Sequence, residues 1–233
     1  MQFPTTHWSV LARATMHGES GALTALDQLC RAYWQPINSF IRFRGFNESD
    51  AKDLTQAFLV RLCEQSVWRR ADAEKGRFRS FLLGALSHFL ADERDRRATQ
   101  KRGGQVEHVS LDFEPMHPEP ASHADALHFD REWACFVMEA ALAQLAGEWE
   151  ERAEAFNVLR SFLPGAAQPA SLEAGAAQLG LSLGAMKSQV HRLRERFREQ
   201  VRQQVAVTVS APHEIEDELQ HLGKVLMSPG TPL

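Results

Sequence analysis

The stretch at residues 172–193 constrains the fold more than any other part of the chain, because its residue types suit particular places in a pair of packed helices. Ala176 is small enough to let two helices approach closely, and Gly180 permits the left-handed backbone of a tight turn. Ser182 can cap the helix that follows. Apolar side chains recur at helical spacing and can form a shared core: Leu179, Met186, Val190 and Leu193. The spacing predicts a helix-turn-helix.

The opposite face of the predicted second helix is polar and basic. Together with Ser182 at its start, this face carries Lys187, Ser188, His191, Arg192, Arg194 and Arg198. These side chains supply the positive charge and the hydrogen-bond donors that contact phosphates and base edges in a major groove. An ordinary helical hairpin with a solvated basic face is the alternative interpretation.

The first half of the chain also follows a helical period. From Ala22 to about Gln100 the apolar positions recur at helical spacing with few β-branched runs, which predicts a helical bundle. A turn at Gly45 and a cap at Asn47 or Ser49 divide the bundle, and its last long helix is expected from Arg77 to Arg97. A shorter helix is expected around residues 8–14.

A segment without sustained periodicity, residues 103–130, follows this half. It contains three prolines and no Lys or Arg, and its six acids are Glu107, Asp112, Glu114, Glu119, Asp125 and Asp130. We therefore predict an all-α fold of two small helical domains joined by an acidic flexible linker. The expected parts are a helical domain at residues 1–102, the linker at 103–130, the helix-turn-helix domain at 131–205 and a C-terminal extension with an amphipathic helix at 206–233.

Composition excludes several classes of protein. The net charge of -4 conceals a more basic remainder, because the acids collect in the linker and near the C-terminus. Three widely spaced cysteines, Cys30, Cys63 and Cys135, indicate a reducing compartment. No stretch approaches the length of a membrane-spanning helix, so we expect a cytoplasmic protein without membrane insertion.

Motifs of enzymes are missing from the sequence. The histidines of residues 103–130 have neither Cys partners nor short paired spacing, so we expect no metal site. The sequence contains no Gly-rich phosphate loop, no nucleophile elbow and no H-E-x-x-H motif. We therefore expect no cofactor, no catalytic residue and no enzymatic activity.

Two separate motifs carry a family resemblance. Residues 176–182 with Met186-Lys187-Ser188 and His191-Arg192 resemble the fourth conserved region of sigma-70 family factors. In the first half, residues 50–58 resemble the polymerase-binding helix of region two, and residues 76–82 with 92–97 resemble its promoter-melting helix. Because both motifs occur in the right order and no third domain lies between them, the chain is similar to the extracytoplasmic-function (ECF) class.

The resemblance implies a bacterial factor that binds core RNA polymerase, recognises promoter DNA and initiates transcription. It implies that Asp50, Asp53 and Gln56, which share one polar helix face, bind polymerase. It assigns the upstream promoter element to the basic helix-turn-helix face. It implies that a further set contacts the melted element: Arg77, Arg79, His88, Arg94, Arg96, Arg97, Lys101 and Arg102. The aromatic side of that helix, with Phe78, Phe81 and Phe89, is expected in the core.

Several alternatives stay open on the sequence. A helix-turn-helix regulator that acts on duplex DNA without polymerase is the rival function, and it would need to dimerise. An anti-sigma protein, or a kinase acting on Thr55 beside the polymerase contact, could control activity. The acidic linker is either a tether or a mimic of nucleic acid in the polymerase channel. The apolar stripe of Ile215, Leu219, Leu222 and Leu226 packs either on its own domain or on region two, where it would hold the factor inactive.

Overall fold

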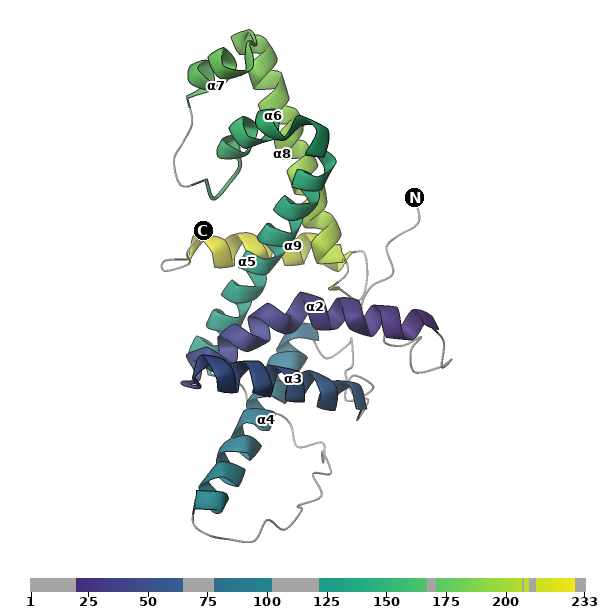
Figure 1. Cartoon of the computed structure of the whole chain (residues 1–233), viewed down its shortest axis with the longest axis vertical. Coiled ribbons are helices and arrows are strands. Elements are labelled where there is room, and N and C mark those ends of the chain that lie inside the picture. Colours follow the sequence, from purple (N-terminus) through teal and green to yellow (C-terminus); the bar gives the residue numbers. More distant parts are fainter. Residues whose placement is uncertain are drawn as a thin grey trace. The chain divides into compact units, whose positions relative to one another are not determined.

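The computed structural model describes residues 20–64, 78–101, 122–166, 171–206, 208–209 and 213–228 (Figure 1). The described residues form helices and turns without any strand, which confirms the all-α prediction. The expected helix around residues 8–14 lies outside the described ranges. Contacts between Cα atoms divide the chain into one unit within residues 7–133 and another that contains residues 134–233.

The first unit is built on the pair α2 (Ser20–Phe43) and α3 (Glu48–Glu64), with α4 (Phe78–Lys101) and the start of α5 (His123–Glu148). Gly45 takes a φ of 92° in the turn after α2, a conformation that glycine adopts without steric cost. Asn47 then caps α3, because its side-chain oxygen accepts a hydrogen bond of 2.9 Å from the Asp50 amide. Buried side chains of α2, α3 and α4 form the core, among them Tyr33, Ile37, Phe40, Leu54, Phe58, Leu62, Leu82, Leu86 and Leu90.

The start of α5 corrects the predicted extent of the linker, since residues 123–130 are helical. The Ser122 hydroxyl accepts a hydrogen bond of 3.1 Å from the Asp125 amide, a cap for this helix. Phe129 and Trp133 are buried one turn apart. Asp125 forms an ion pair with Arg44, and Asp130 forms one with Arg79, both in the same unit. These two acids therefore belong to the folded unit and not to a flexible linker. Residues 103–121 lie outside the described ranges.

The second unit contains the predicted helix-turn-helix, formed by α7 (Leu172–Leu179) and α8 (Leu183–Ala206) after the short α6 (Ala153–Leu159). Gly180 ends α7 with a φ of 64°, the left-handed conformation expected there. The Ser182 hydroxyl accepts a hydrogen bond of 3.2 Å from the Ala185 amide at the start of α8. Met186, Val190 and Leu193 are buried, as predicted, whereas Leu179 is half-buried.

The last helix, α9 (Glu214–Met227), packs against α8 within the second unit. Ile215, Leu222 and Val225 are buried, and Leu219 and Leu226 are half-buried. An ion pair of 2.9 Å joins Arg202 of α8 to Glu216 of α9. These contacts agree with the structural alternative for the apolar stripe, in which the extension covers its own domain.

Candidate polymerase and promoter-DNA surfaces

The solvent-facing side of α3 holds two of the three predicted polymerase-binding residues. Asp53 and Gln56 are exposed, next to Lys52, which forms an ion pair of 2.8 Å with Glu48. Val60 continues this side as one of the exposed large apolar residues of the chain. The face therefore combines an acid, an amide and an apolar side chain, all open to a partner.

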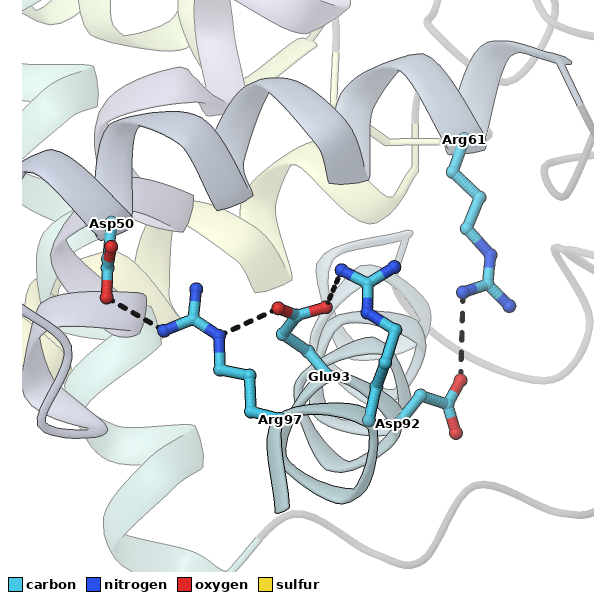
Figure 2. Close-up of polar contacts among 6 residues, drawn as sticks. Asp50, Arg61, Asp92, Glu93 and Arg97 are labelled. Atoms are coloured by element: carbon cyan, nitrogen blue, oxygen red, sulfur yellow. Dashed lines mark hydrogen bonds and ion pairs between the residues drawn. The ribbon is translucent and has the colours of Figure 1, made fainter. Parts of the chain in front are cut away.

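Asp50 differs from the other two, because its side chain is bound to α4 (Figure 2). Its carboxylate accepts a hydrogen bond of 2.8 Å from Nη1 of Arg97, and Nε of Arg97 donates to Glu93 at 2.8 Å. Glu93 also binds Arg96 with its other carboxylate oxygen. Hydrogen bonds from Arg97 to Asp50 and Glu93 raise the pKa of Arg97, which is charged in any case.

Thr55, the predicted target of a kinase, is completely buried in α3 with 0% of its surface exposed. Its hydroxyl donates to the Ala51 carbonyl at 2.7 Å and accepts a hydrogen bond of 3.3 Å from the Asn38 amide group. The hydroxyl is therefore covered in the folded domain, and a kinase would reach it only after α3 moves or opens locally. Control by phosphorylation of Thr55 stays a prediction.

Arg79 occupies the interior of the first unit, which corrects the expectation that it lies on an exposed strand-binding face. Only 4% of its surface is exposed. Its Nε donates a hydrogen bond of 2.6 Å to Asp130, and its guanidinium lies 4.4 Å from the centre of the Trp133 ring. Arg79 thus anchors the first turns of α5, and its buried guanidinium is not accessible to DNA.

The other members of the predicted melted-element set differ in their accessibility. Arg94 is exposed, donates to the Arg44 carbonyl at 2.7 Å and lies over the Phe46 ring. Arg96 is exposed and Arg97 is half-buried, and His88 is half-buried in the middle of α4. Arg77, Arg102 and the side chain of Lys101 lie outside the described residues.

The aromatic side of α4 follows the prediction where the structure describes it. Phe89 is buried, and its ring centre lies 5.5 Å from that of Phe58 on α3. Phe81 is half-buried, and the side chain of Phe78 lies outside the described residues. Packing by Phe89 therefore fixes α4 against α3.

On α8, the basic residues divide into two groups according to their partners. Arg194 donates to the Phe162 carbonyl at 3.0 Å, and Arg198 forms an ion pair of 2.5 Å with Glu195. Within the part of the chain that the structure describes, Lys187, His191 and Arg192 are exposed and have no ion-pair partner. The free positive charge is thus concentrated in the first turns of α8.

The hydroxyl groups of Ser182 and Ser188, near these basic residues, form hydrogen bonds to the backbone of α8. Ser182 caps α8, and the exposed Ser188 donates its hydroxyl hydrogen to the Gly184 carbonyl at 3.1 Å. The Ser188 oxygen keeps lone pairs that can accept from a base amino group.

Two residues that support this helix-turn-helix were not singled out from the sequence. A Cβ atom on Gly175 would lie 2.6 Å from Cε of Met186, so Gly175, next to the predicted Ala176, leaves room for the Met186 side chain of α8. Glu148, near the end of α5, binds Arg196 at 2.6 Å and also Gln200. The Gly-Ala-Ala run was the available signal for Gly175, whereas nothing local marks Glu148.

The described residues thus form a helical bundle with an open polar helix, and a helix-turn-helix whose second helix is basic on its exposed face. The family model described as ECF sigma factor matches residues 12–203. The chain therefore belongs to the ECF sigma factor family, whose members act with RNA polymerase in promoter recognition and transcription initiation and are not enzymes. No curated protein and no solved structure matches the chain. None of the described helices is long and apolar enough to cross a membrane.

Proposed function

We propose that this protein is the promoter-specificity subunit of an RNA polymerase holoenzyme in the cytoplasm. The observation that carries the proposal is the exposed group Lys187, His191 and Arg192 on α8, which forms no ion pair among the described residues and lies on the exposed face of a well-packed helix-turn-helix. The two cations, Lys187 and Arg192, are available to phosphates and base edges, and the His191 ring can contact a base edge. Arg194 and Arg198 contribute less, because protein groups already bind them.

The polymerase contact is assigned to α3. Asp53 and Gln56 are exposed there beside Val60, and Asp50 lies one turn earlier at the edge of the same helix. Carboxylates on a rigid helix form strong, oriented hydrogen bonds with arginines of a partner. The apolar Val60 side chain adds surface that is removed from water on docking. We assign this face to the core polymerase.

Contact with the melted promoter element is assigned to the C-terminal turns of α4. Arg94 and Arg96 are exposed there and Arg97 is half-buried, and His88 lies farther toward the start of the same helix. Several arginines around the end of one helix suit a single strand, whose affinity is dominated by its phosphates. Arg77, Lys101 and Arg102 stay predicted members of this set, and Arg79 is no longer one of them.

Footprinting on promoter DNA with and without core polymerase tests the proposal. The isolated protein is expected to bind weakly, because each of its two DNA-contacting surfaces is small, and addition of core polymerase should give specific protection of two promoter elements. Tight and specific protection by the protein alone would instead support the rival function, a regulator that acts without polymerase.

A further inference from the structure

Asp50 and Arg97 belong to two different proposed surfaces, yet they bind each other in the structure. Asp50 lies on the polymerase-binding helix α3, and Arg97 lies on the DNA-contacting helix α4 (Figure 2). The Nη1 atom of Arg97 is 2.8 Å from Oδ2 of Asp50. While this ion pair exists, one N–H of the Arg97 guanidinium and one oxygen of the Asp50 carboxylate are engaged with each other, and each charge is partly neutralised by the other.

We propose that Arg97 links polymerase docking to promoter contact: Asp50 occupies its terminal nitrogen in the free factor, and docking of polymerase on Asp50 releases that nitrogen to a promoter phosphate. The inference rests on the proposed function, because it takes both surfaces from it. The exchange needs no chemistry beyond the replacement of one carboxylate by a phosphate oxygen on the same guanidinium.

Glu93 is the residue that positions Arg97 for this exchange of partners. It has 7% of its side-chain surface exposed, and its carboxylate accepts from Nε of Arg97 at 2.8 Å and also binds Arg96. Loss of Asp50 therefore leaves Arg97 anchored through Nε, with Nη1 released from its carboxylate partner. The Phe46 ring, 5.4 Å from the guanidinium carbon, supports the same placement.

The accessibility of the ion pair suits an exchange of partners. The side chains of Arg97 and Asp50 are 39% and 36% exposed, so both atoms of the pair can be reached from solvent. Exposed ion pairs of this kind are weak, and their loss changes an equilibrium by about two- to five-fold. An arginine of polymerase can therefore displace Arg97 from Asp50 without unfolding the domain.

The test measures binding of a short fluorescent single-stranded oligonucleotide to the free full-length protein by anisotropy, across a range of salt concentrations. Asp50→Ala should tighten binding by about two- to five-fold and steepen the salt dependence by about 0.7, the value of one added phosphate contact. Addition of Arg97→Ala to Asp50→Ala should abolish this gain. Asp50→Asn serves as a second variant if the alanine protein melts early.

Asp53→Ala is the matched control, because it removes the same charge from an exposed position of the same helix and releases no arginine. A gain with Asp53→Ala equal to that of Asp50→Ala, or a gain that survives Arg97→Ala, would overturn the proposal. In either case the effect would come from net charge alone.

Linkage requires a reciprocal effect on polymerase. Without DNA, Arg97→Ala should tighten binding of core polymerase by about two- to five-fold, since Asp50 is then free, and an unchanged affinity would contradict the coupling. An initiation assay on the wild-type protein from the same preparation distinguishes failure of this inference from failure of the proposed function. If the wild type initiates and the variants show no coupling, only this inference fails; if the wild type never initiates, the proposed function fails.

Discussion

Replacement of Arg79 by Met tests whether this arginine holds the fold or contacts DNA. Removal of one member of a buried ion pair costs about 3–5 kcal/mol, and loss of a cation–π contact costs about 1 kcal/mol. Asp130 is 22% exposed and can be rehydrated, which reduces the cost of losing the ion pair. Met keeps much of the aliphatic packing on Trp133, which reduces the cost of losing the cation–π contact. We expect Arg79→Met to lower the free energy of unfolding by about 2–3 kcal/mol.

Such a loss corresponds to a fall in Tm on the order of 10 °C for a unit of this size, which circular dichroism measures directly. Arg96→Met is the matched control on the same helix, because Arg96 is 60% exposed. It should change Tm little and should weaken binding of a single-stranded oligonucleotide. The reasoning is refuted if Arg79→Met leaves Tm unchanged and weakens oligonucleotide binding as Arg96→Met does.

Three further predictions concern the other surfaces. Arg192→Ala should weaken footprint protection of the upstream element by about 1–3 kcal/mol if it reads a base, whereas Arg198→Ala, already paired within α8, should have a smaller effect. Asp53→Arg should leave Tm unchanged and reduce co-purification with core polymerase, because it reverses the charge on an exposed face; a normal yield would reject the assignment. Deletion of residues 212–233 should lower Tm, because α9 covers an apolar side of α8; tighter binding to polymerase or DNA at an unchanged Tm would favour autoinhibition instead.

The helix-turn-helix was predictable because its residue types are tied to local backbone geometry. Gly180 takes the left-handed turn, Ser182 caps the next helix, and Met186 is buried where the helical period placed it. Each of these relations spans only a few residues. The exposed basic residues of α8 followed from the same period, although the sequence could not show that Arg194 binds the Phe162 carbonyl, 32 residues away.

Relations between distant residues account for what the sequence did not predict. Arg79 and Asp130 are 51 residues apart, and Arg97 and Asp50 are 47 apart. A buried arginine and an exposed one look alike in a basic stretch, so Arg79 was placed with the DNA-contacting set. The start of α5 was taken as linker for the same reason, because Asp125 binds Arg44 in the turn after α2 and Asp130 binds Arg79 of α4.

Transcription from a promoter template with core polymerase, with and without this protein, tests the central claim most directly. The protein should convert core polymerase from non-specific synthesis to a run-off transcript with one defined start, and Asp53→Arg and Arg192→Ala should each reduce the yield of that transcript. A protein that protects promoter DNA in footprints and yet never changes the transcripts made by core polymerase would contradict the account.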